Sequence, residues 1–147
     1  MKGVIKTACA AALLLVSTQA MAADHQIKML NAGAEGPMVF EPSYLKVAPG
    51  DTVTFVATDA GHNSQSFLTP DGAQAWTGGM NENITVTLDK EGVYLYKCAP
   101  HTVMAMVGVI QVGEAKNKDA AVAAATQTSA QFVMNQGRLN KYMEQVK

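Results

Sequence analysis

Four side chains of this sequence could together bind one soft metal ion. The segment from Cys98 to Met106 reads Cys-Ala-Pro-His-Thr-Val-Met-Ala-Met, which gives the spacing Cys-x2-His-x4-Met, and His62 lies upstream in Gly61-His62-Asn63. A thiolate, two imidazoles and a thioether suit copper, which alternates between a softer reduced ion and a harder oxidised ion. A Cys and two His with a weakly bound axial Met are typical of electron transfer, because nearly the same geometry suits both oxidation states. The residues therefore predict a copper site of the kind that transfers electrons.

Two methionines compete for the axial position. Met104 and Met106 both follow His101 in the same short segment. If this segment already belongs to an extended strand, the alternation of side chains places both methionines on the same side. The direction of the side chains therefore does not choose between them.

Each of these residues also has an ordinary structural interpretation, and other chemistries share some of them. Alone, His62 would more often be a loop residue, Met106 a core residue and Cys98 a small buried hydrophobic residue. A cysteine hydrolase would need an oxyanion site and an orienting third group, and neither is visible in the sequence. A zinc site would prefer further Cys, His or carboxylate ligands. The joint occurrence of these ligand types favours copper and electron transfer. The alternative function is that of a periplasmic copper carrier or storage protein without a redox role.

The first 22 residues have the organisation of a secretory signal peptide. Lys2 and Lys6 precede an apolar run at residues 8–16 and form a positively charged N-terminal region. Ala20-Met21-Ala22 then supplies the small residues of a cleavage site. We expect cleavage after Ala22, export to the periplasm and a mature domain of residues 23–147. Cys9 leaves with the signal peptide, so Cys98 stands alone in an oxidising compartment, where a lone thiol is paired with another molecule, reactive or held by a ligand.

Composition narrows the class of protein further. The chain has 147 residues, of which 48% are hydrophobic and 16% charged, with a formal net charge of −1. This balance fits one globular domain and excludes both a disordered chain and a strongly basic nucleic-acid binder. After the signal peptide, no apolar stretch is long enough for a membrane helix. We expect no nucleic-acid or membrane partner and, because no oligomerisation signal is present, a monomer.

The pattern of residues 23–113 predicts a β-sandwich. Short β-branched and aromatic runs alternate with turn residues, and in residues 83–88 the three aliphatic side chains fall on one face. The ligand segment lies between two of these runs, so its residues converge at one end of the sandwich while His62 comes from another loop. The predicted strands are residues 26–30, 38–40, 44–47, 52–57, 84–88, 93–97 and 107–112.

The pattern changes after Gly113, where Ala, Gln, Lys and Met replace the alternating runs. Residues 117–146 are predicted to form C-terminal helices, one at 118–126 and another at 129–145, with Thr128 or Ser129 as its N-cap. Apolar side chains recur at helical spacing in the second segment, and this face is expected to pack on the sandwich rather than to bind a cofactor.

The mature chain resembles the pseudoazurins, a family of cupredoxins. Plastocyanins share the spacing Cys-x2-His-x4-Met but stop after the last strand, whereas pseudoazurins continue into two helices, as this chain is predicted to do. The resemblance rests on these segments: Met29-Leu30-Asn31, Met38-Val39-Phe40-Glu41-Pro42, Val47-Ala48-Pro49-Gly50-Asp51-Thr52-Val53-Thr54-Phe55, Gly61-His62-Asn63, Asn81-Glu82-Asn83, Lys97-Cys98-Ala99-Pro100-His101 and Met106-Val107-Gly108-Val109.

The resemblance implies an all-β fold, an eight-stranded Greek-key sandwich with two C-terminal helices. It also implies one type 1 copper held by His62, Cys98, His101 and Met106, and thereby chooses Met106 as the axial ligand. Pseudoazurins carry single electrons in the periplasm, so the expected partners are a copper nitrite reductase, cytochromes or other respiratory oxidoreductases. No substrate is turned over, and we expect no enzymatic activity and no catalytic residue.

Two neighbours of the ligands are expected to shape the site. Asn63 follows a ligand, and its backbone N–H could bond the Cys98 sulfur while its side chain ties the two ligand loops together. Pro100 has no N–H to donate to the thiolate and restrains the loop.

By resemblance, the electron leaves through the edge of His101, inside an apolar docking patch. The candidates for this patch, beside Pro100, are Pro37, Met38, Val103 and Met104. Pseudoazurins usually surround the patch with lysines, but this chain has Ala32, Ala34, Ala60 and Gly78 where such lysines are often found. We expect docking to depend more on apolar contact and less on salt.

Overall fold

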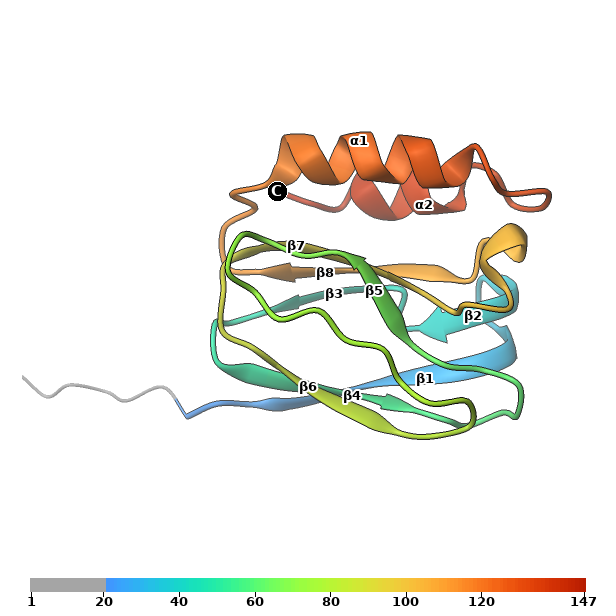
Figure 1. Cartoon of the computed structure of the whole chain (residues 1–147), viewed down its shortest axis with the longest axis horizontal. Helices are drawn as coiled ribbons and strands as arrows, with labels where there is room; N and C mark the ends of the chain where they lie inside the picture. The colour runs from blue at the N-terminus through green and yellow to red at the C-terminus, as the bar shows by residue number, and fades with distance from the viewer. Residues whose placement is uncertain (1–20) are drawn as a thin grey trace, which may run out of the picture.

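Two four-stranded β-sheets pack face to face, and two helices cover the outer face of one of them (Figure 1). The structure is a computed structural model that describes residues 21–147; the predicted signal peptide lies outside the described residues except for Met21 and Ala22. The first sheet has the order β2 (Gly36–Glu41), β1 (Asp24–Gly33), β4 (Asp51–Val56) and β6 (Ile84–Leu88). The second has the order β3 (Tyr44–Val47), β8 (Val107–Val112), β7 (Gly92–Lys97) and β5 (Gln65–Leu68).

The two central strands of the second sheet are buried on both faces. In β7, Tyr94 and Tyr96 point into the space between the sheets, while Val93 and Leu95 point toward the helices. This pattern follows from the two-residue period of a strand with a layer on each side, and it explains why the run is almost continuously apolar. Continuing the alternation past the end of β7 places Cys98 in the space between the sheets.

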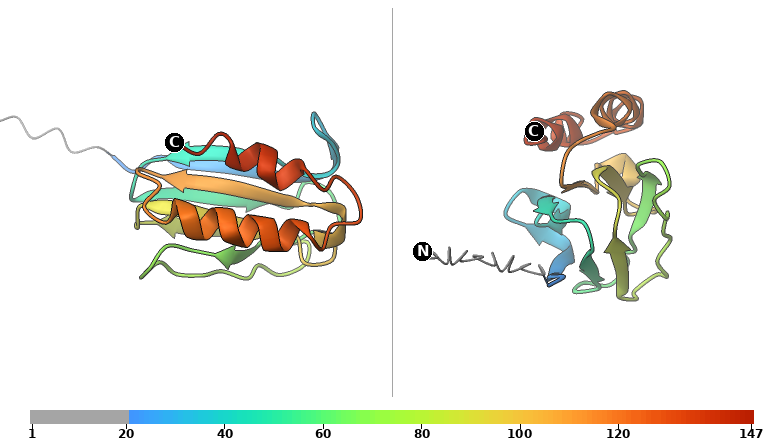
Figure 2. Two further views of the ribbon diagram at one scale, coloured as in Figure 1. Left: turned by 90° about the horizontal axis from the view of Figure 1, so that it is seen from above. Right: turned by 90° about the vertical axis from the view of Figure 1, so that its left-hand side faces the viewer.

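The helices are α1 (Lys118–Ser129) and α2 (Arg138–Met143), and they lie side by side on β7 and β8 (Figure 2). The buried face of α1 consists of Ala121, Ala125 and Ser129, whose small side chains let the helix approach the sheet closely. From α2, Leu139 and Tyr142 fill the same layer. None of the helices in residues 21–147 has the length and apolar character needed to cross a bilayer.

The predicted β-sandwich with C-terminal helices is confirmed, with differences of detail. Strand β5 was not predicted, because all four of its residues are half-buried and its sequence does not alternate. The second helix begins at Arg138 and not at residue 129, and the predicted N-cap is wrong because Thr128 and Ser129 are the last residues of α1. Residues 130–137 form a connection in which Asn135 has φ 53°, which a right-handed helix does not allow. A 3-10 helix that was not predicted, η1 (Thr102–Met104), occupies the ligand segment, and β8 begins at Val107 as predicted.

Candidate metal centre

Three of the four predicted ligands, His62, Cys98 and His101, meet at one end of the sandwich, where the β4–β5 loop approaches the β7–β8 loop. The two Nδ1 atoms of His62 and His101 are 3.2 Å apart. The Cys98 Sγ lies 3.7 Å from His62 Nδ1 and 3.4 Å from His101 Nδ1. Two imidazole nitrogens and one sulfur therefore form the corners of a nearly equilateral triangle.

The triangle has the size that a transition-metal ion requires. A point equidistant from its three corners lies about 2.0 Å from each donor atom, close to the metal–nitrogen and metal–sulfur distances of protein zinc sites, roughly 2.0 and 2.3 Å. One thiolate and two imidazoles in trigonal arrangement, with a thioether nearby, are the donor set of an electron-transfer copper site. The residues therefore fit a copper ion without rearrangement of the three side chains.

Cys98 is wholly buried, and its backbone anchors the ligand segment. Its N–H donates to the Met106 carbonyl at 2.9 Å, which closes the loop between them. Burial raises the pKa of the Cys98 thiol, while the backbone N–H groups of Asn63 and His101 act in the opposite direction. The buried sulfur thus has donors aimed at it that suit a thiolate, and metal binding would release its proton.

The ring of His62 is oriented by Asn31, a residue of strand β1. Its Nε2 is 2.9 Å from Asn31 Oδ1, so Nε2–H donates to the amide and the lone pair of Nδ1 faces Cys98. Burial lowers the pKa of His62, and the neighbouring His101 lowers it further, which favours the neutral imidazole that binds metals. Asn31 lies in one of the segments that resemble the pseudoazurins, but nothing in the sequence indicated this contact.

The loop that carries His62 is fastened to the loop before β6. The Asn81 side chain accepts from the Gly61 N–H at 2.5 Å, and the Asn81 N–H donates to the His62 carbonyl at 2.8 Å. Asn81 has φ 62°, a left-handed conformation that Asn tolerates better than most residues. These bonds hold the histidine from the backbone side while Asn31 holds its ring.

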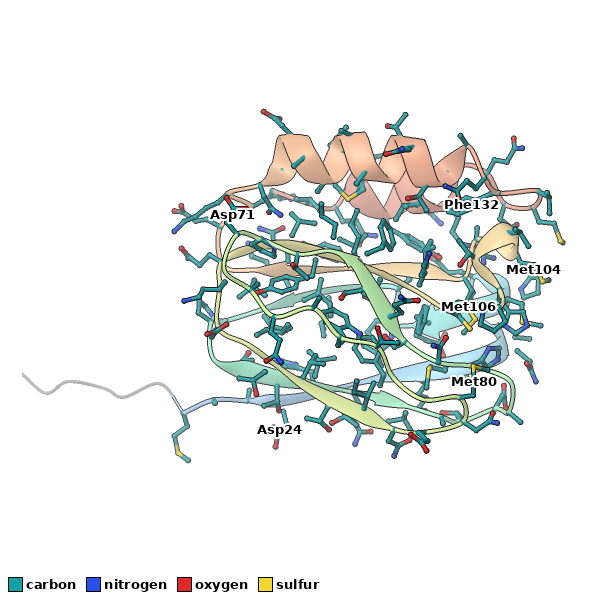
Figure 3. All side chains as sticks on the ribbon, viewed as in Figure 1. Asp24, Asp71, Met80, Met104, Met106 and Phe132 are labelled. Atoms are coloured by element: carbon teal, nitrogen blue, oxygen red, sulfur yellow. The ribbon has the colours of Figure 1, made fainter. Side chains whose placement is uncertain are left out.

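Met106 and Met104 lie in different environments. Met106 is wholly buried, and its N–H donates to the His101 carbonyl at 3.2 Å. Met104 ends η1 and is half-buried, at the outer edge of the molecule (Figure 3). The expectation that strand alternation places both on the same side is wrong, because residues 102–105 form a helical turn that ends in Ala105 at φ 60°. Burial separates the two methionines where the sequence pattern did not.

Asn63 connects the two ligand loops through its side chain. Its Oδ1 accepts from the Ala99 N–H at 2.9 Å, and its Nδ2 donates to the Gly78 carbonyl at 3.1 Å. Thr102, which the sequence did not single out, donates from its hydroxyl to the Cys98 carbonyl at 2.9 Å. Pro100 is exposed between these two anchoring points.

The candidate docking residues lie on the same end of the molecule. His101 is half-buried, unlike the two wholly buried donors His62 and Cys98. Val103 is 47% exposed, Pro37 is exposed, and Met38 and Met104 are half-buried. Two residues that the sequence did not suggest join this surface: Val133 and Met134 are exposed, and their N–H groups contact the Val103 carbonyl at 2.8 and 3.4 Å.

Comparison with known proteins agrees with this geometry. Residues 27–113 match the family described as copper binding proteins, plastocyanin/azurin family. A putative pseudoazurin of Rhizobium leguminosarum bv. viciae is 52% identical over 106 residues, covering 71% of this chain and 70% of that protein. The pseudoazurin of Paracoccus pantotrophus is 44% identical over 117 residues, covering 78% and 81%.

A solved structure extends the likeness to the fold. The pseudoazurin from Methylobacterium extorquens AM1 superposes with a TM-score of 0.72 at 36% identity, covering 84% of this chain and 99% of that one. The chain belongs to the pseudoazurins. The resemblance noted in the sequence is thereby confirmed, as is the cupredoxin-like fold. Copper is the cofactor, and the chain is an electron-transfer protein of the cupredoxin class.

Proposed function

We propose that this pseudoazurin carries single electrons in the periplasm, using one copper ion held by His62 Nδ1, Cys98 Sγ, His101 Nδ1 and the Met106 thioether. The observation that carries the proposal is the triangle of donor atoms, with edges of 3.2, 3.4 and 3.7 Å, which needs no rearrangement to accept a metal ion. When bound, copper supplies a one-electron couple. We take Met106 rather than Met104 as the axial ligand because Met106 is wholly buried next to the loops that carry the other three ligands.

The protein's contribution is to keep the ligands in place in both oxidation states. Asn31 fixes the ring of His62, Asn63 ties Ala99 to the other ligand loop, and the Met106 carbonyl binds the Cys98 N–H. Ligands held in this way move little when the charge changes, and a small reorganisation favours rapid electron transfer. Burial of Cys98 also excludes water from the thiolate.

The electron would pass through the partly exposed edge of His101 to a redox protein docked on Pro37, Met38, Pro100, Val103 and Met104. A small apolar patch of this kind suits a short-lived complex. The expected partners are a copper nitrite reductase, a cytochrome or another periplasmic oxidoreductase, met by a monomer of this chain.

Export is part of the same proposal. Cleavage after Ala22 would leave a mature domain that begins at Ala23, one residue before β1, and consists of the sandwich at 23–113 and the helices within 117–146. Met21, Ala22 and Ala23 are exposed, which suits a processing site. Removal of residues 1–22 would leave Cys98 as the sole cysteine of the mature chain.

The experiment that tests the proposal is a visible absorption titration of the mature protein with Cu(II), followed by ascorbate. We expect an intense blue band that saturates at one copper per chain and bleaches on reduction. Cys98→Ser should bind without the blue band, because the thiolate is responsible for it, and Met104→Leu should keep the band. A colourless wild type that still binds Cu(I) tightly would overturn the redox function and favour the carrier.

A further inference from the structure

The backbone between His101 and Met106 is held by the C-terminal segment of the chain. Three successive carbonyl groups of the ligand segment accept hydrogen bonds from residues 133–138, which are about thirty positions away. These bonds are Val133 N–H to Val103 O (2.8 Å), Met134 N–H to Val103 O (3.4 Å), Asn135 Nδ2 to Met104 O (3.5 Å) and Arg138 Nη1 to Ala105 O (3.2 Å). The tail therefore contacts the ligand loop at its backbone, independently of which side chains the loop carries.

Arg138 provides the most buried of these contacts. Its side chain is almost fully buried, and its guanidinium donates to four backbone carbonyl groups, those of Ala105 (3.2 Å), Pro37 (3.1 Å), Met38 (2.9 Å) and Glu35 (3.1 Å). Within residues 21–147, no carboxylate lies within 4.0 Å of this cation. Its charge is therefore stabilised by the dipoles of these carbonyl groups. Because a guanidinium stays protonated, the hydrogen bonds to the four carbonyl groups persist at every physiological pH.

Two of these carbonyl groups belong to residues in a strained conformation. Met38 has φ 51° and Ala105 has φ 60°, a left-handed region that is unfavourable for residues with a side chain. Both carbonyls accept from the same nitrogen, Arg138 Nη1. The guanidinium thus supports the backbone conformation both in the β1–β2 turn and in the ligand loop.

The link to Met106 runs through a single peptide group. The Ala105 carbonyl and the Met106 N–H belong to the same planar unit, so fixing one fixes the other. Arg138 binds the carbonyl side of this unit, and the His101 carbonyl accepts from its N–H side at 3.2 Å. The orientation of the peptide that carries the predicted axial ligand therefore depends on a residue of α2.

We propose that Arg138 is a positioning residue of the copper centre, which sets the placement of the Met106 thioether against the His62–Cys98–His101 triangle. In this proposal the C-terminal helices buttress the ligand loop in addition to covering the sheet. The proposal rests on the proposed function in one respect, since it takes Met106 as the axial ligand.

The experiment compares Arg138→Lys and Arg138→Met with Asn117→Ala as a matched control. Asn117 also ties the tail to the sheet, donating to the Val93 carbonyl at 3.0 Å and accepting from the Val93 N–H at 2.6 Å, but it is at the start of α1 and contacts no residue of the ligand loop. Lysine keeps the positive charge but has no fork that reaches several carbonyl groups at once. Folding of each variant is checked by circular dichroism.

Two measurements decide the result. In the metal-free protein, we expect amide hydrogen exchange at Met106 to be about tenfold faster in both Arg138 variants and unchanged in Asn117→Ala, because only the former release its peptide group. In the Cu(II) protein, we expect the ratio of the two thiolate absorption bands to change in the Arg138 variants only. A folded Arg138→Lys with wild-type exchange and spectrum would overturn the proposal, and so would an equal change in the control.

A milder variant decides the outcome if neither Arg138 variant folds. Asn135→Gly removes the side-chain donor to Met104 at an exposed position, and its φ of 53° is easily adopted by glycine. We expect the same changes with smaller amplitude, and their absence would overturn the proposal. A wild type without a blue band would overturn the proposed function instead, and the exchange data would still test whether Arg138 holds the loop.

Discussion

At the scale of single residues, the metal centre depends on amides that bind no metal. Asn31 orients the ring of His62, Asn63 joins the ligand loops through the Ala99 N–H, and Asn81 fastens the backbone at Gly61. Each supplies an oxygen acceptor at 2.5–2.9 Å to a group that would otherwise be free to turn. Groups that do not bind the metal therefore hold the three-donor triangle in place.

Replacing Asn31 with Ala should weaken copper binding. The variant removes the acceptor of His62 Nε2–H, so the imidazole can rotate or take the other tautomer, and loss of such a partner typically costs about 10–100-fold in metal affinity. Competition titration with a chelator measures the affinity. Asn140→Ala, an exposed position on α2, is the matched control and should bind like the wild type. Equal affinities for Asn31→Ala and the control would contradict the proposed role of Asn31.

Asp51 lies at the opposite end of β4 from the His62 loop. Its carboxyl group should make the free energy of unfolding depend on pH in the acid range. The Ala23 N–H, the His25 ring and the Ala48 N–H lower the pKa of this carboxyl group in the folded state. The unfolded chain thus takes up the proton first as the pH falls, so the stabilisation is complete above the ordinary Asp pKa of about 3.9 and is lost progressively below it.

Urea denaturation of the metal-free protein between pH 6 and pH 3 checks this expectation. The wild type should be more stable than Asp51→Asn at pH 6, and the difference should shrink as the pH falls toward 3. Using the difference between the two proteins cancels the titration of the groups that do not contact Asp51. Parallel stability curves would show that the three donors around Asp51 do not bias its protonation.

At the scale of elements, the sequence predicted what periodicity controls and missed what long-range contacts control. The two-residue alternation in β6 and the apolar runs of β7 and β8 placed the strands correctly. The Cys98–Met106 spacing placed three candidate ligands in one loop. The start of α2 was missed because apolar side chains recur at helical spacing from residue 132, although residues 130–137 serve to contact the ligand loop. Arg138 and Asn31 had no local signal, since their partners lie 33 or more and 31 positions away.

The helical layer should contribute strongly to stability through α2. Leu139 is wholly buried between α2 and the sheet, and shortening it to Ala leaves a cavity that typically costs about 2–5 kcal/mol. Val122→Ala on the outer face of α1, where the side chain is 46% exposed, should change stability by no more than roughly 0.5 kcal/mol. Urea denaturation of the metal-free proteins measures both. A small loss for Leu139→Ala would mean that the helices pack only loosely on β7 and β8.

At the scale of the whole molecule, the metal centre lies at one end of the sandwich, and that end is not strongly basic. Asp59 lies near enough to His62 to affect its pKa, Glu82 follows Asn81, and Lys97 precedes Cys98. Glu35 and Lys141 form an exposed ion pair at 3.5 Å, which cancels their charges. The surface around His101 therefore combines exposed apolar side chains with charges of both signs, which gives little long-range attraction for an acidic or a basic partner.

This charge distribution predicts a weak dependence of the electron-transfer rate on salt. With the anion hexacyanoferrate(III) as oxidant of the reduced protein, the rate should change little between low and physiological ionic strength, where charges more than about 8 Å apart are largely screened. Introducing Ala34→Lys and Ala60→Lys, both at exposed positions, should accelerate the reaction about two- to tenfold at low salt and lose that advantage as salt is added. Val122→Lys, on the outer face of α1, adds one positive charge away from the site and should have a smaller effect than either lysine alone. A steep fall of the wild-type rate with salt would contradict the prediction, because it would require a cationic surface around His101 that the sequence and structure do not provide.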